Sequence, residues 1–216
     1  MLKTPGRKVF RVSGRPDPDE LAKYDLDDDF ANPGDIDDPL EIEAWSNLDY
    51  VFSHGSKTRY SRGNVGVAYT STQVETAVFE KGYWVNQLYF KKPNPPASVD
   101  VLEFEFHVDG KNRDYTSAPL YHPELTNPDP EQYEHCHKVS DECLADELEY
   151  ISAPSARRNQ GVNIPIFRDT ALPTRAPAVV IAYEGLFLKQ NTGLLYTSSA
   201  TQVGVAFRPV YPNWHP

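Results

Sequence analysis

A change of hydrophobic period within one short segment constrains the fold more than any other feature of this chain. Val65, Val67 and Tyr69 alternate with small residues, which is the period-2 pattern of a β-strand. Apolar side chains then recur every three or four residues, which is the period of an amphipathic helix. The segment therefore predicts a strand over residues 65–70, followed at once by a helix over residues 73–81.

Both ends of that helix carry recognisable signals. Thr72 and Glu75 stand in the S/T-x-x-E arrangement of a capping box, in which each side chain satisfies a backbone donor at a helix start. Gly82 is expected to end the helix. Glu80 then falls in the last turn, at the edge of the apolar face, where a glutamate can be half-buried and still face a cleft.

Further strands follow. In residues 101–108, the apolar side chains alternate with Glu103, Glu105 and His107, as expected for a sheet with one solvated face. Short apolar runs of strand length occupy residues 164–167, 178–183 and 202–207, and the second of these is a candidate central strand.

The remaining segments complete an α+β fold class in which strands dominate. Residues 109–134 are expected to form a long polar connection. A helix over residues 140–149 is predicted from the apolar face of Cys143, Leu144 and Leu148. The length of 216 residues fits a single domain spanning residues 1–216.

Sequence features relevant to localisation are few. No apolar run approaches the length of a transmembrane helix, and the first residues, MLKTPGRKVF, lack the apolar core of a secretory signal. We therefore expect a cytoplasmic protein that does not associate with membranes.

Charge is distributed unevenly along the chain. The net charge is −10, yet residues 16–43 alone carry 12 acidic side chains and one lysine. The rest of the chain is nearly neutral, so nothing indicates a nucleic-acid-binding surface. We interpret this acidic arm as a solvated insertion, and the alternative is a contact surface for a basic partner or a second subunit.

Two cysteines, Cys136 and Cys143, are too few for a disulfide framework. Together with His135 and His137 they could supply four zinc ligands, although adjacent residues converge poorly on one ion. The prediction favours Cys143 in the apolar face of a helix, and no metal is expected.

Arginines are the candidates for phosphate binding. The chain has neither the GxGxxG nor the GxxxxGK signature, so it lacks the glycine-rich backbone cradles of Rossmann and P-loop proteins. A dinucleotide diphosphate would have to be held by side chains, and the planar fork of arginine donates two hydrogen bonds at once. The candidates are Arg11, Arg59 and Arg157.

The order of these residues resembles the RES domain, a toxin family named for its arginine, glutamate and serine and related in fold to ADP-ribosyltransferases. The pattern comprises Phe10-Arg11, Arg59, Tyr69, Glu80 and Pro154-Ser155. The block YISAPSARRNQGVNIPIF, residues 150–167, is similar to the serine strand, loop and returning strand of that family, and it adds the accessory polar residues Arg157 and Asn163. The resemblance implies a split sheet.

One position differs from the family pattern. Lys57 and Thr58 stand where the family usually has two glycines before the loop arginine. Arg62 is therefore an alternative to Arg59 as the functional arginine of this loop.

The resemblance implies that the protein cleaves NAD into nicotinamide and ADP-ribose. Arg11 and Arg59 would hold the diphosphate, and Glu80 would stabilise the positive charge that develops on the ribose. Tyr69, a core aromatic by its pattern alone, would lie beside the nicotinamide ring, and Ser155 would hydrogen-bond the ribose or Glu80.

Two other functions remain open. The same pocket could transfer ADP-ribose to a protein, or the arginines and Glu80 could be structural ion pairs in a non-enzymatic binding module. The resemblance also implies a toxin–antitoxin system, in which a helix-turn-helix antitoxin covers the site.

Overall fold

The computed structural model describes residues 6–15, 38–172, 180–191, 193–200 and 205–207. It confirms the prediction of an α+β fold rich in strands. The elements are β1 (Arg7–Gly14), α2 (Pro39–Ser53), β2 (Lys57–Thr58), β3 (Ser61–Arg62), β4 (Ala68–Ser71), α3 (Val74–Val85), the π-helix η2 (Asn86–Phe90), β5 (Ser98–Val108), β6 (Asn112–Asp114), η3 (Pro123–Thr126), η4 (Pro130–Gln132), α4 (Glu134–Ala145), β7 (Tyr150–Pro154), β8 (Val162–Ile166), η5 (Asp169–Ala171), β9 (Ile181–Gln190), β10 (Gly193–Ser198) and β11 (Val205–Phe207).

Nine of the strands form one sheet in the order β11-β10-β9-β5-β1-β4-β8-β7-β6. β1 pairs with β5 along its whole length, from Arg7 opposite Val108 to Gly14 opposite Val101. Its pairing with β4, in contrast, is Phe10 opposite Ser71. The sheet is therefore split at the junction of β1 and β4 into two halves that diverge.

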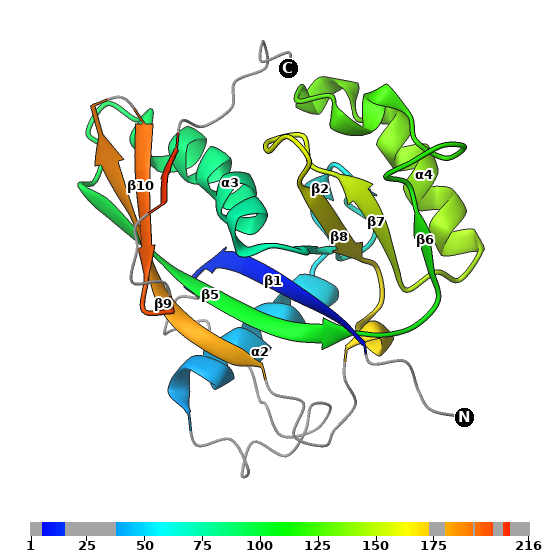
Figure 1. Cartoon of the computed structure of the whole chain (residues 1–216), viewed down its shortest axis with the longest axis horizontal. Helices are drawn as coiled ribbons and strands as arrows, with labels where there is room; N and C mark the ends of the chain where they lie inside the picture. The colour runs from blue at the N-terminus through cyan, green and yellow to red at the C-terminus, as the bar shows by residue number, and fades with distance from the viewer. Residues whose placement is uncertain (1–5, 16–37, 173–179, 192, 201–204, 208–216) are drawn as a thin grey trace.

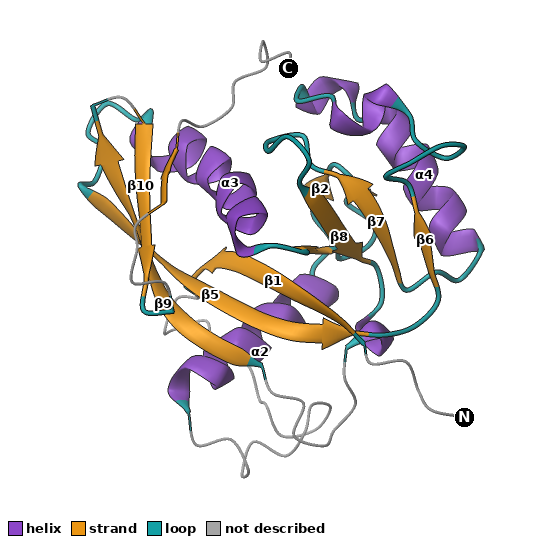
Figure 2. Ribbon diagram, in the orientation of Figure 1, coloured by secondary structure: helices purple, strands orange, loops and turns teal. Residues whose placement is uncertain are grey.

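Helices cover the two halves differently. α2 and α3 lie on opposite faces of β1 and β5, whereas α4 lies against the half that contains β6, β7 and β8 (Figures 1 and 2). Each helix buries its own apolar cluster against the strands. In the cluster of α2, Ala44 and Leu48 pack with Leu102 and Phe104. In the cluster of α3, Ala77 and Val78 pack with Val101 and Phe187. In the cluster of α4, Cys136 and Val139 pack with Ile151.

The predicted ends of α3 are wrong. The helix begins at Val74 with Gln73 as its N-cap and without a side-chain cap, so Thr72 and Glu75 form no capping box. Thr72 lies one residue beyond β4, and its N–H instead donates to the carbonyl of Val162 on β8 (3.0 Å). Gly82 is buried inside the helix and does not end it.

The strand predicted over residues 101–108 is β5, but its polar face is not uniformly solvated. Glu103 is only 4% exposed because the hydroxyl of Tyr196, on β10, donates a hydrogen bond to its carboxylate. Glu105 pairs with Lys8 (2.6 Å), and His107 is exposed. The prediction was wrong for Glu103 because the sequence does not show which side chain covers that face.

The helix predicted over residues 140–149 is α4, which begins and ends earlier. Leu148 is buried as expected, but it lies beyond the helix. Glu147 has a φ of 56°, and the N–H of Leu148 donates to the carbonyl of Cys143 (2.8 Å), so a turn brings Leu148 to the core. The connection over residues 109–134 contains β6, which pairs with β7, and two short 3-10 helices.

The last predicted strands correspond to β8, β9 and β11. β9 extends to Gln190 and lies between β5 and β10, so it is an interior strand, although β1 is the middle one. Residues 178, 179 and 202–204 of the predicted runs lie outside the described residues.

The structure describes only the last part of the acidic arm, residues 38–43. Residues 16–37 lie outside the described residues, but residues 38–43 belong to α2 and its N-cap. Asp38 accepts a hydrogen bond from the N–H of Leu40 (2.9 Å), and Glu43 pairs with Arg15 (2.6 Å). These carboxylates cap and anchor a helix that packs on the core. Within the described ranges, no helix has the length and apolar character needed to cross a bilayer.

Candidate active site

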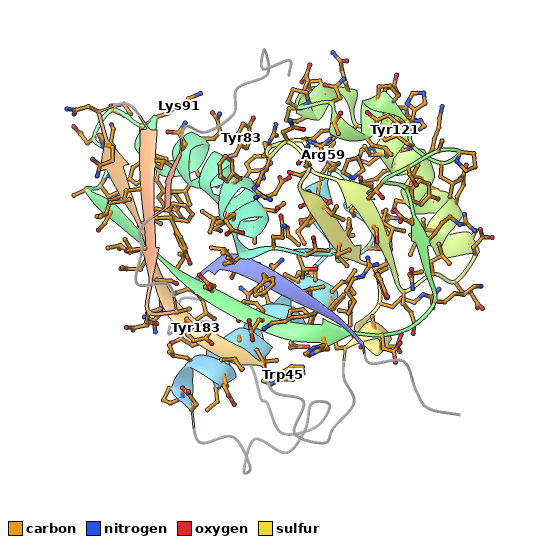
Figure 3. All side chains as sticks on the ribbon, in the orientation of Figure 1. Trp45, Arg59, Tyr83, Lys91, Tyr121 and Tyr183 are labelled. Atoms are coloured by element: carbon orange, nitrogen blue, oxygen red, sulfur yellow. The ribbon has the colours of Figure 1, made fainter. Side chains whose placement is uncertain are left out.

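A cavity of about 380 Å³ lies beside the split in the sheet. Figure 3 labels Tyr83 on α3 and Arg59 after β2 near this region, whereas Trp45 on α2 lies on the opposite face of the sheet. The lining residues come from β1, β2, β4, α3, the η4–α4 segment and the β7–β8 region. They are Arg11, Val12, Ser13, Lys57, Thr58, Arg59, Tyr69, Thr70, Ser71, Ala77, Glu80, Lys81, Trp84, Pro130, Glu131, Tyr133, Arg157 and Asn163.

Glu80 is held in place by two strands. Its Oε1 accepts hydrogen bonds from the Oγ of Ser155 (2.7 Å) and from the Nδ2 of Asn163 (2.7 Å). Asn163 is itself fixed because its Oδ1 accepts from the Oγ of Ser71 (2.9 Å). No hydrogen bond to Oε2 is recorded among the described residues, so this second oxygen stays available to a ligand.

Ser155 has the geometry of a positioning residue. Its Oγ donates to Glu80 and accepts from the backbone N–H groups of Arg157 and Arg158 (3.1 Å each). The two N–H groups fix the hydroxyl so that its proton points at the carboxylate. Ser155 does not line the cavity itself and acts on it through Glu80.

A second group of polar residues is the pair Arg11 and Lys81. Arg11 donates to neutral acceptors, the Oδ1 of Asn47 (3.0 Å) and the carbonyl of Tyr69 (2.9 Å). Burial lowers the pKa of Arg11 to about 10, and burial together with the nearby Arg11 charge lowers the pKa of Lys81 to about 8. No ion pair is recorded for either residue in the described part of the chain, so their charges are available to an anion.

Arg157 is the most unusual cation of the cavity. It is 2% exposed, its Nη2 donates to the carbonyl of Pro128 (3.2 Å), and its guanidinium lies 3.6 Å from the ring centroid of Tyr83. Its Nε and Nη1 are buried without a hydrogen-bond partner among the described residues. Burial lowers the pKa of Arg157. Buried donors without acceptors are costly, so a side chain of this kind points to an acceptor supplied by a ligand.

Of the two loop arginines, Arg59 lies in the cavity and Arg62 does not. Nη1 of Arg59 donates to the carbonyls of Leu125 (3.2 Å) and Asn127 (2.7 Å). Arg62 is exposed, and both of its terminal nitrogens donate to Glu134 (3.1 Å each). Arg59 therefore connects β2 to the opposite wall of the cavity, in addition to lining it.

This difference predicts opposite outcomes for two conservative substitutions. Arg59→Lys should lower the free energy of unfolding by about 1–3 kcal/mol, because the buried carbonyl of Leu125 and the partly buried carbonyl of Asn127 lose their donor. Arg62→Lys, at an exposed ion pair, should leave the urea midpoint unchanged. Urea denaturation followed by circular dichroism measures both, and equal midpoints for the two variants would contradict the anchoring role of Arg59.

Tyr69 belongs to both the core and the cavity. Its hydroxyl accepts from the N–H of Tyr60 (2.8 Å) and donates to the Oγ1 of Thr58 (2.9 Å). Its ring packs on the buried cluster of α4 and also lines the cavity. Because the hydroxyl is engaged internally, the ring is the part of Tyr69 that a ligand can contact.

Three cavity residues had no role in the sequence analysis. They are Lys81, Trp84 and Tyr133. Trp84 is 42% exposed, and it stands four residues after Glu80, so helical spacing places it on the same face of α3. Tyr133 reaches the cavity through the η4–α4 segment, where the sequence pattern indicates only a polar connection.

The four side chains considered as zinc ligands from the sequence, those of His135, Cys136, His137 and Cys143, do not form one cluster among the described residues. Cys136 Sγ lies 3.7 Å from the carbonyl of Glu124, and Cys143 Sγ lies 3.7 Å from the hydroxyl of Tyr115. The Nε2 of His137 lies 2.9 Å from the carbonyl of Thr58. Each side chain has a separate partner, and burial raises the pKa of both thiols.

The cavity is positively charged although the chain is acidic. Its lining holds five cationic side chains and two carboxylates, whereas the whole chain has a net charge of −10. Such a concentration of one sign in a cleft favours an anionic ligand.

The family model of the RES domain matches residues 38–190. That range contains Arg59, Tyr69, Glu80 and the β7–β8 block, whereas β1 with Arg11 lies outside it. A search of the curated proteins gave no match.

Proposed function

This chain belongs to the RES-domain family, and we propose that it is an NAD glycohydrolase, which splits NAD into nicotinamide and ADP-ribose. RES domains are associated with NAD-related toxin–antitoxin function. The observation that carries the proposal is the fixed carboxylate of Glu80 in a positively charged cavity.

The cationic side chains of the cavity would bind NAD. Arg11 and Lys81 have no acidic partner among the described residues, and they would hold the diphosphate of NAD. Arg157 would donate its unpaired Nε and Nη1 to another oxygen of the same substrate. Guanidinium groups suit this task because their planar donors match two phosphate oxygens at once.

Glu80 supplies the chemistry. When the bond between the ribose C1′ and the nicotinamide nitrogen breaks, its electron pair leaves with the neutral nicotinamide, and positive charge develops on the ribose. A nearby carboxylate stabilises that charge more in the transition state than in the ground state. Water then adds its oxygen to C1′ and releases one proton, and the product is ADP-ribose.

The hydrogen bonds of Ser155 and Asn163 support this role. Both go to Oε1, so the carboxylate is oriented before the substrate binds and Oε2 can face the ribose. Preorganised charge of this kind costs little reorganisation during the reaction. Trp84, exposed on the same face of α3, would offer its ring to the nicotinamide, together with the ring of Tyr69.

Lys81 should make the proposed NAD hydrolysis depend on pH. The pKa of Lys81 is lowered to about 8, so its ammonium is charged below that pH and neutral above it. We expect kcat/KM for NAD to fall as the pH rises through about 8, because kcat/KM reports the ionisation of the free enzyme. Lys81→Arg should remove this decline, since a guanidinium stays charged. A decline that is identical in both proteins would rule out Lys81 as its source.

Free nicotinamide tests the proposed activity. The purified protein is incubated with NAD and no other protein, and nicotinamide is separated by chromatography. Release of nicotinamide with free ADP-ribose supports hydrolysis. Labelled ADP-ribose attached to protein, seen only when cell extract is added, would instead support the transferase. If NAD is not consumed in either condition, the proposal is overturned, and of the three functions considered only the non-enzymatic binding module remains.

A further inference from the structure

Two histidines and a glutamate form a cluster where η3 meets α4, and none of the three lines the cavity. His122 is the N-cap of η3, Glu124 lies in its first turn, and His135 lies in the first turn of α4. One ligand atom from each side chain lies within 4.8 Å of the other two. The cluster therefore joins two elements that are separate in sequence.

The side chains are already close to one another. The rings of His122 and His135 are stacked, with centroids 4.1 Å apart and planes 27° apart. The Nδ1 of His135 lies 3.9 Å from the Oε2 of Glu124. The Nδ1 of His122 accepts a hydrogen bond from the N–H of Glu124 (3.3 Å), so its Nε2 is the nitrogen left for an ion. His122 and Glu124 are exposed, so their side chains can adjust without disturbing the core.

Two imidazoles and one carboxylate are a ligand set that zinc prefers. With zinc–ligand bonds of about 2.0–2.2 Å, neighbouring ligand atoms of a tetrahedral site lie about 3.3 Å apart. Movements of about 1 Å would bring the three donors to that spacing. The stacked rings would also have to turn, because each nitrogen lone pair lies in the plane of its ring, and water would complete the coordination.

The position of the cluster gives it a structural consequence. The chain between Glu124 and His135 carries the carbonyls of Leu125 and Asn127, which accept from Arg59, and the carbonyl of Pro128, which accepts from Arg157. The same stretch forms one wall of the cavity through Pro130, Glu131 and Tyr133. A link between the two ends of this stretch would fix the cavity wall.

We propose that His122, Glu124 and His135 bind one zinc ion, which links η3 to α4. The chemistry of the donors also admits nickel and cobalt, whereas magnesium, which prefers oxygen ligands, is a poor match. The proposal does not depend on NAD hydrolysis, because none of the three side chains lines the cavity.

The test is a titration of the full chain, freed of metal by a chelator, with zinc alone. Isothermal titration calorimetry should show saturable binding of one ion per chain, and zinc should raise the melting temperature. His135→Ala should weaken zinc binding by at least about tenfold, since it removes one of three protein ligands. His107→Ala is the matched control, because His107 is an exposed histidine on β5, outside the cluster. The His107→Ala variant should bind zinc with the affinity of the parent.

A second variant distinguishes the loss of a zinc ligand from a folding defect. Glu124→Gln keeps the size of an exposed side chain but replaces the anionic ligand, and it should also weaken zinc binding. Circular dichroism without zinc shows whether each variant is folded. The proposal is overturned if the parent shows no saturable zinc binding, or if folded His135→Ala and Glu124→Gln bind zinc as the parent does.

Discussion

Glu80→Gln should keep the fold and lower the turnover of NAD on the order of 10²-fold or more, because a neutral amide cannot stabilise the positive charge that develops on the ribose. The substitution preserves the size of the side chain, and the amide oxygen can still accept from Ser155 and Asn163, which now donate to Oε1 of Glu80. Steady-state kinetics with NAD, together with thermal unfolding, measure both parts of this prediction.

The cavity offers a matched control for Glu80. Glu131 is the second carboxylate of its lining, and it lies on η4, away from Ser155 and Asn163 in sequence. Glu131→Gln should therefore change turnover only a few-fold, although it makes the same chemical change in the same cavity. If Glu80→Gln and Glu131→Gln gave equal turnover, the special role of Glu80 would be wrong.

Arg157→Met should separate stability from function. The substitution removes a buried cation with two unsatisfied nitrogens, but it also removes the hydrogen bond to the carbonyl of Pro128. These effects oppose each other, so the free energy of unfolding should change by no more than about 1 kcal/mol. Methionine has a similar length, and its sulfur can pack on the ring of Tyr83. The value of kcat/KM for NAD should nevertheless fall about 10- to 100-fold, because charged hydrogen bonds to the substrate are lost.

Arg158 provides the control for that experiment. It follows Arg157 directly, but it donates to the side chains of Gln73 and Thr76 and does not line the cavity. Arg158→Met should leave kcat/KM unchanged. A large loss of stability in Arg157→Met would show instead that Arg157 is a structural cation with an internal role.

The sequence predicts the succession of β4 and α3 because a change of hydrophobic period is local information. The predicted start of the strand at residue 65 is wrong, since β4 begins at Ala68. The order of motifs also indicates Glu80, Ser155 and Asn163, which the structure brings into hydrogen-bond contact. The resemblance to a family supplies this order, because the position of Glu80 alone indicates only a glutamate in the last turn of a helix.

Other features depend on tertiary contacts that no local pattern contains. The burial of Glu103 depends on a hydroxyl from β10, and the burial of Leu148 depends on a turn after α4. Lys81 and Tyr133 join the cavity only because α3 and the η4–α4 segment face each other across the split in the sheet. The unpaired donors of Arg157 are likewise visible only when its neighbours are in place.

The central claim is that Glu80 supports hydrolysis of the bond between nicotinamide and ribose. The most direct measurement is a parallel product analysis of the parent protein and Glu80→Gln, each incubated with NAD alone and followed by mass spectrometry. We predict that the parent releases nicotinamide and free ADP-ribose in equal amounts, and that folded Glu80→Gln releases neither at a comparable rate. Intact NAD after incubation with the parent, or an equal yield from Glu80→Gln, would contradict this account.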